Sequence, residues 1–149
     1  MNAIAKPAAV DPNMRQFVEH ILAGSQVARR LGIQLRTVEP ERVVMALPYD
    51  AANITVGTTV HGGVIATLID IVGAAGSASG ADSSKIKGGA TSSLVINYLN
   101  AANGVDLEAE GKVIKRGSDT TVTEIAVRDP AGTLIATGTL TPRMLKAAD

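Results

Sequence analysis

The apolar stretch of residues 62–81, which holds one charged side chain, Asp70, restricts the fold of this chain most. A helix this apolar has no solvent face, so protein or lipid must surround it. A charge in the middle of a bilayer is costly, and the glycines within the stretch and the lack of flanking Lys, Arg or aromatic residues also disfavour insertion. We therefore predict a buried core helix from about His61 to Ser79, and no membrane span.

The start of this helix has the composition of a ligand site. Gly62 and Gly63 allow the backbone to approach a ligand closely, and the first amides of a helix favour negative charge. Asp70 is costly to bury unless it is paired or functional. Amides and a lone carboxylate on one buried helix indicate a site for acyl transfer or hydrolysis. His61, at the helix start, is expected to hold a loop by hydrogen bonds rather than to transfer protons.

Composition excludes several classes of function. The net charge of the 149 residues is zero and no basic run occurs, which argues against a nucleic-acid partner. The absence of cysteine excludes disulfides and thiol catalysis, and His20 is the only other histidine, so we expect no metal site. Residues 1–16 lack a continuous apolar segment, so the expected location is cytoplasmic.

The remaining residues indicate an α+β fold. Residues 1–32 are predicted to form a tail and short helices, with Asp11-Pro12 starting the first, and residues 33–149 to form a single domain. Apolar alternation and turn residues predict strands at 33–38, 43–47, 91–99, 107–113, 121–128 and 133–140, with a connection over 80–89 and Pro142 ending the last strand. Short turns between the last four strands predict an antiparallel meander, and the whole predicts one sheet wrapped on one central helix.

The pattern His61-Gly62-Gly63, with Asp70 nine residues after the histidine and Tyr98-Leu99 in the following strand, resembles the hotdog-fold acyl-CoA thioesterases. The similarity covers about residues 30–142 and is greatest to the phenylacetic-acid-degradation type of the 4-hydroxybenzoyl-CoA thioesterase superfamily. This resemblance implies a hotdog fold and hydrolysis of an acyl- or aryl-CoA to the free acid and CoA. It implies no cofactor, because coenzyme A is part of the substrate.

The resemblance also implies roles for individual residues. Asp70 would act as general base on water or as nucleophile, and the amide of Gly62 or Gly63 would polarise the thioester carbonyl. Asn53 in the preceding loop would assist, with Thr55 as the alternative. The residues expected to bind substrate are Thr91, Ser92 or Ser93 at a strand start, which would orient the water, and Arg116, Gly117 and Ser118 at a turn, which would hold the nucleotide of coenzyme A.

Helix geometry adds a constraint that is independent of the family. Gly63 and Asp70 lie roughly 10 Å apart along the axis at 1.5 Å per residue. One thioester carbonyl cannot easily contact both on the same helix, whereas two helices related by a twofold axis can provide one group each. We therefore expect a homodimer, or a tetramer made of two dimers, with shared active sites.

Two other functions remain open on this fold. The alternative from a different class is a non-catalytic acyl-CoA or acyl-carrier binding protein, which has little reason to retain a buried Asp70. A hotdog dehydratase is disfavoured because its His-Phe-Pro segment is missing.

Overall fold

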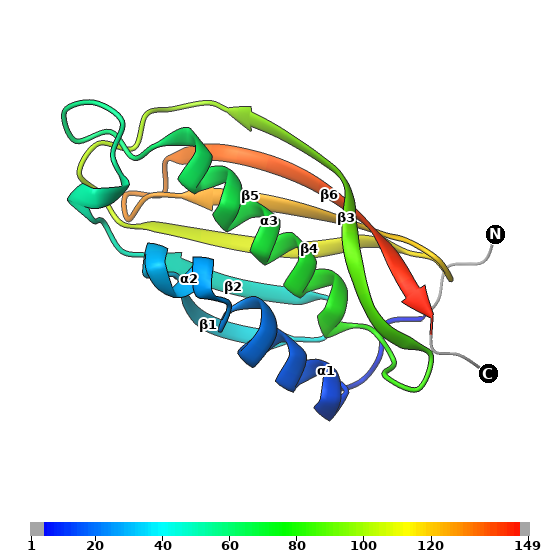
Figure 1. Ribbon diagram of the computed structural model, residues 1–149. Coiled ribbons are helices and arrows are strands. Elements are labelled where there is room, and N and C mark those ends of the chain that lie inside the picture. The colour runs from blue at the N-terminus through cyan, green and yellow to red at the C-terminus, as the bar shows by residue number, and fades with distance from the viewer. Residues whose placement is uncertain (1–4, 147–149) are drawn as a thin grey trace.

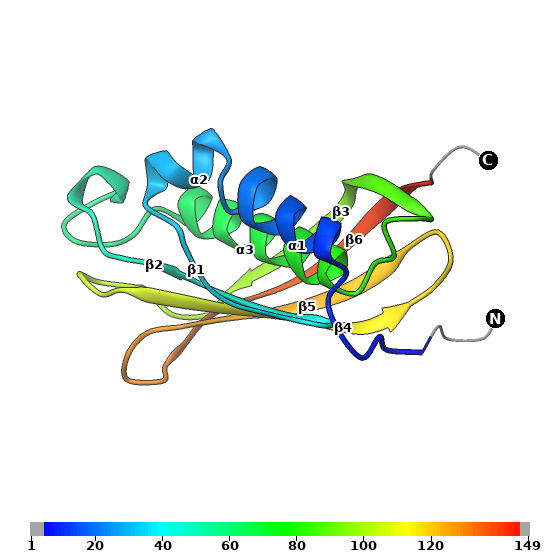
Figure 2. The same ribbon diagram turned by 90° about the horizontal axis from the view of Figure 1, so that it is seen from below.

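A computed structural model describes residues 5–146. Helix α3 (Gly62–Ser79) lies across one face of a six-stranded antiparallel sheet (Figure 1). Its mean hydropathy of 1.4 and its length would suffice to cross a membrane, but 61% of it is buried inside the protein. The predicted core helix and α+β class are thus confirmed, since the sheet and the N-terminal helices pack against α3 (Figure 2).

The sheet has the strand order β1-β2-β4-β5-β6-β3. Its strands are β1 (Gln34–Glu39), β2 (Arg42–Leu47), β3 (Ile86–Tyr98), β4 (Leu107–Arg116), β5 (Thr121–Arg128) and β6 (Leu134–Lys146). Only β4, β5 and β6 form a meander, so the predicted four-strand meander is wrong. Residues 99–106 are long enough to let β4 pair with β2 while β3 pairs with β6 at the opposite edge.

The paired ends of β3 and β6 are longer than predicted. β3 begins at Ile86, inside the predicted connection, and β6 continues past Pro142. Pro142 lies opposite Thr91, where the register shifts before Ser93. A proline cannot donate to a strand ladder but is tolerated at such a bulge, so Pro142 does not end the strand.

The N-terminal helices pack on α3. They are α1 (Pro12–Gln16), the π-helical turn η1 (Phe17–Leu22) and α2 (Gln26–Leu31). Asp11 caps α1 as predicted, and it also accepts hydrogen bonds from the amide and hydroxyl of Ser83, in the loop after α3. The side chains of Met14, Val18 and Ala28 are buried. The N-terminal residues thus share one packed interior with the sheet.

Glycines let α3 lie close to the sheet. A Cβ on Gly73 would lie 2.8 Å from Leu140 Cβ, and one on Gly111 would lie 2.9 Å from Val72 Cγ1. This close approach lets aliphatic side chains fill the interior of a chain with one Phe, two Tyr and no Trp. The close approach also determines which face of α3 points away from the centre of the sheet. Asp70 lies on that face.

Candidate functional site

Asp70 is held by a threonine from the neighbouring strand. The Thr91 hydroxyl donates a hydrogen bond to Asp70 Oδ1 at 2.8 Å. Thr91 lies at the β3 bulge opposite Pro142, and this irregularity turns its side chain toward α3. The structure therefore brings Thr91 to the carboxylate, whereas Ser92 and Ser93 make no hydrogen bond to Asp70.

His61 closes the N-terminus of α3. Its Nδ1 accepts a hydrogen bond from the Gly63 amide at 2.8 Å, and its own amide donates to the Asn53 carbonyl oxygen. The positioning role predicted for His61 agrees with these contacts. Within residues 5–146, the Gly63 amide has a partner, while the Gly62 amide makes no hydrogen bond. The Gly62 N–H is thus able to donate a hydrogen bond to an oxygen of a ligand.

Tyr98 also contacts the N-terminus of α3, from the surface of the protein. Its hydroxyl donates to the Gly62 carbonyl oxygen at 2.8 Å, and its side chain is 54% exposed. Tyr98 therefore lies at the surface rather than in the core. The hydroxyl requires a polar partner at the helix end, which keeps the ring at the surface.

The structure of the loop before α3 distinguishes between Asn53 and Thr55, the two candidates for the assisting residue. Asn53 is buried in η2 (Ala51–Asn53), and its side-chain amide donates to the Leu31 carbonyl oxygen at 3.2 Å. It thereby anchors the loop to the end of α2. Thr55 is exposed and lines a shallow hollow beside Gly62 and Tyr98. Thr55 is thus the better placed of the two to reach a ligand at the helix start.

A mainly apolar pocket of about 170 Å³ extends from Asp70 and Thr91. It lies between α3, the N-terminal helices and the paired ends of β3 and β6. Its apolar side chains are Met14, Phe17, Leu22, Ala74, Ala78, Ala81, Ile86, Ala90, Pro142 and Met144. The sequence did not reveal this pocket, because its walls include the parts of β3 and β6 that the pattern assigned to loops.

Arg116 ends β4 and does not lie in the turn, so the turn position predicted for it is wrong. It is 8% exposed, its Nε donates to Glu41 Oε1 at 2.6 Å, and its Nη2 donates to the Ser77 carbonyl oxygen at 2.6 Å. A register shift between Val113 and Lys115 turns the end of β4 inward, which strict alternation could not foresee. The guanidinium thus holds the C-terminal turn of α3, while Gly117 and Ser118 follow in the turn and Ser118 donates to Asp119.

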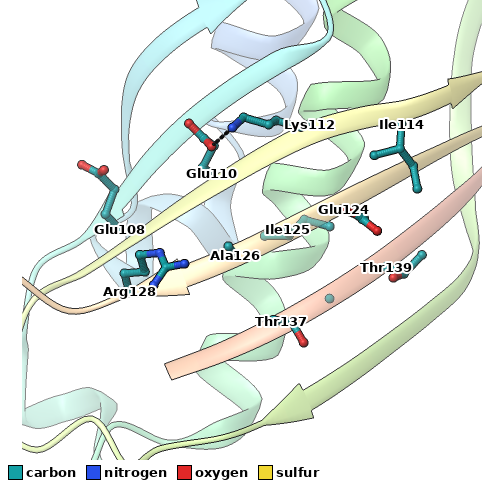
Figure 3. Close-up of a pocket in the computed structure, with 11 residues that line it drawn as sticks. Glu108, Glu110, Lys112, Ile114, Glu124, Ile125, Ala126, Arg128, Thr137 and Thr139 are labelled. Atoms are coloured by element: carbon teal, nitrogen blue, oxygen red, sulfur yellow. Dashed lines mark ion pairs between the residues drawn. The ribbon is translucent and has the colours of Figure 1, made fainter. Parts of the chain in front are cut away.

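The outer face of the sheet carries a second, polar hollow, drawn in Figure 3. Glu110 there pairs with Lys112 at 2.6 Å and with Arg42 from β2, and these hydrogen bonds, first that of Lys112, hold the pKa of Glu110 below its usual value. This face lies across the sheet from α3 and Asp70. Among residues 5–146 no three His, Cys, Asp or Glu side chains gather closely enough to hold a metal ion.

Comparison with known proteins identifies similar chains. The family model of the thioesterase superfamily matches residues 57–136. A protein named "Putative esterase" from Saccharolobus solfataricus is 31% identical over 124 residues, which cover 83% of this chain and 86% of that protein.

Solved structures share the fold. A thioesterase family protein from Silicibacter pomeroyi has 27% identity and a TM-score of 0.82 over 90% of this chain and 99% of that one. A hypothetical thioesterase protein with coenzyme A from Streptococcus pneumoniae has 21% identity and a TM-score of 0.68 over 78% of this chain and 88% of that one. These likenesses, with the sheet and central helix, confirm the expected hotdog fold.

The buried Arg116–Glu41 pair generates a stability prediction. Arg116→Ala leaves the Glu41 carboxylate buried without a partner, which should lower the free energy of unfolding by about 3–5 kcal/mol. Denaturant unfolding measures this change, and the exposed neighbour variant Lys115→Ala should shift it by less than about 0.5 kcal/mol. Equal, small effects of both variants would contradict a buried pair.

Proposed function

Because this chain belongs to the thioesterase superfamily, we propose that it hydrolyses the thioester of an acyl-coenzyme A to the free acid and coenzyme A. The observation that carries the proposal is the Asp70 carboxylate, held by Thr91 in the wall of a mainly apolar pocket. The Streptococcus pneumoniae relative with coenzyme A supports this class of substrate. The narrower phenylacetic-acid-degradation type and a cytoplasmic location remain part of the proposal.

Asp70 can perform the reaction in two ways. The Thr91 hydrogen bond occupies Oδ1 and leaves Oδ2 to act. In one route, Oδ2 takes a proton from water as the water oxygen attacks the carbonyl carbon, and the proton then passes to the departing coenzyme A sulfur. In the other, Oδ2 attacks the carbonyl carbon, coenzyme A leaves, and water hydrolyses the mixed anhydride. Neither route requires a metal or a cofactor.

The Gly62 amide is the best placed donor to the oxygen that gains charge. A preorganised N–H at a helix start stabilises an oxyanion without reorganisation. The Gly63 amide is less suitable because His61 Nδ1 already accepts its hydrogen. Thr55, beside Gly62, would contact the substrate from the loop.

Gly62 and Asp70 are too far apart to act within one chain. Eight residues of α3 separate them, which corresponds to about 12 Å along the axis. β3 is an edge strand, and Val95, Tyr98 and Leu99 along or next to it are more than half exposed. Pairing of two β3 edges about a twofold axis would cover these side chains and set the two α3 helices antiparallel. We therefore propose a homodimer, or a pair of dimers, in which each site combines Asp70 of one subunit with Gly62 of the other.

The nucleotide end of coenzyme A is proposed to lie near Gly117 and Ser118. Arg116 takes no part in this contact, since its guanidinium is used by Glu41 and Ser77. A non-catalytic acyl-CoA or acyl-carrier binding protein is the alternative function. The Thr91 contact favours the enzyme, because a binding site for an apolar chain gains nothing from an oriented carboxylate.

Asp70→Asn tests the catalytic role. The amide keeps the shape of the side chain but can neither take a proton nor attack, so kcat should fall about 100-fold or more while the fold is retained. Release of free thiol from a panel of acyl-CoA substrates measures the rate. Glu124→Gln, an acid-to-amide change on the exposed outer face of β5, should leave kcat unchanged. Near-normal turnover by folded Asp70→Asn would exclude the proposed catalysis and favour the binding protein.

Gly62→Pro tests the shared site. Proline is favoured at the first residue of a helix, and His61 has the extended ψ of 132° that suits a residue before proline, so this variant removes the amide hydrogen with little strain. It should be nearly inactive, whereas Gly62→Ala, whose Cβ would lie 3.5 Å from Tyr98, should remain active.

Random mixing of Gly62→Pro and Asp70→Asn chains makes about half of the dimers hybrids, and each hybrid contains one intact site out of two. The co-refolded mixture should therefore recover about a quarter of wild-type activity. Each variant alone should stay inactive. No recovery in proven hybrid dimers would show that each site lies within one chain.

A further inference from the structure

The pocket beside Asp70 follows one face of α3. Asp70, Ala74, Ser77, Ala78 and Ala81 line it, and residues at this spacing lie along one side of a helix. All the side chains after Asp70 on this face are small, so a channel runs along the helix surface. Phe17, with Met14 and Leu22, lies over it from the N-terminal helices.

Ser77 and Met144 line the far part of the pocket. The Ser77 hydroxyl is paired with that of Thr121 and lies 3.8 Å from Met144 Sδ. Ser77 lies about 10 Å along the helix axis from Asp70. The volume of 170 Å³ is slightly larger than that of a cavity of about 150 Å³ that binds one benzene ring. The pocket therefore has room for about six carbon atoms beyond the reacting carbonyl.

No Lys, Arg or His side chain of residues 5–146 lines the pocket. Asp70 is the single charged side chain among the described residues that line it. Arg116, behind Ser77, already donates to Glu41 and to the Ser77 carbonyl oxygen. An acyl group with a terminal carboxylate would bury that charge without a partner, which is strongly unfavourable.

Ala74 and Met144 lie at the near and far parts of the pocket. Ala74 lies one helical turn beyond Asp70, where a larger side chain would meet the acyl group soon after its carbonyl. Met144, on the extended end of β6, forms part of the far wall next to Ser77. Gly89, opposite Met144, has little space for a side chain, since its Cβ would lie 3.1 Å from the Arg143 carbonyl oxygen and 3.6 Å from Met144 Sδ.

We infer that this pocket selects an uncharged hydrocarbon acyl group of about six carbons, and that Ala74 and Met144 determine its length. The inference rests on the proposed thioester hydrolysis, for which it specifies the substrate class. Each methylene that fits or fails to fit an apolar pocket changes kcat/KM by about tenfold or more, so the selection is measurable.

The test measures kcat/KM for acetyl-, hexanoyl-, hexadecanoyl- and adipoyl-CoA. Wild-type protein should prefer hexanoyl-CoA to each of the other three by at least about tenfold. Adipoyl-CoA matches hexanoyl-CoA in carbon number and adds only the carboxylate, so this pair isolates the effect of charge.

Variants test the two residues in opposite directions. Ala74→Leu should lower the ratio of kcat/KM for hexanoyl-CoA to that for acetyl-CoA at least about tenfold, and Met144→Ala should shift the preference to longer chains. Ala126→Leu is the matched control, because Ala126 lies on the outer face of β5, across the sheet from the pocket (Figure 3), and it should leave the preference unchanged. Circular dichroism checks that each variant is folded, and if Ala74→Leu does not fold, Met144→Ala decides alone.

The outcomes separate this inference from the function on which it rests. Failure of wild-type protein to hydrolyse any of the four substrates would overturn the proposed function. Hydrolysis with a preference for acetyl-, hexadecanoyl- or adipoyl-CoA would overturn the inference alone. An unchanged chain-length preference in folded Ala74→Leu and Met144→Ala would do the same.

Discussion

The burial of α3 is the constraint on which the rest of this structure depends. An apolar helix with no solvent face cannot rest on a flat sheet alone, so the sheet covers one side and the N-terminal helices cover part of the other. Glycines at the contact allow the close approach that aliphatic packing needs. On the face of α3 that points away from the centre of the sheet, small side chains leave room for a pocket. Asp70 lies in the wall of this pocket.

The same helix separates the two groups that we propose for catalysis. Its first amide, at Gly62, can stabilise negative charge, and its carboxylate, at Asp70, lies more than two turns farther along. In the dimer that we propose, a second copy with an antiparallel α3 would remove this separation. The exposed apolar edge of β3 provides a surface that gains from such pairing. In this proposal, α3 and β3 would link the assembly of the dimer to its chemistry.

Much of this arrangement was predictable from the sequence. The apolar run fixed the position of α3, the Asp11-Pro12 cap marked α1, and alternation located most strands. The pairing of β3 with β6 was not predictable, because local sequence patterns do not determine which distant strand becomes a neighbour. Bulges were a further source of error, because one extra residue reverses the face of every later side chain. This explains both the inward turn of Arg116 and the turn of Thr91 toward Asp70.

The kcat of Thr91→Val tests the central claim, that Thr91 orients Asp70 for reaction, most directly. Valine keeps the branched shape and removes the hydroxyl, so kcat should fall about 10- to 100-fold through loss of a hydrogen bond to a charged group, with KM nearly unchanged. Thr91→Ser should restore most of kcat, and Ser92→Ala, at the neighbouring exposed hydroxyl, should have little effect. A wild-type kcat in Thr91→Val, or an equal loss in Thr91→Ser, would contradict this account of the site.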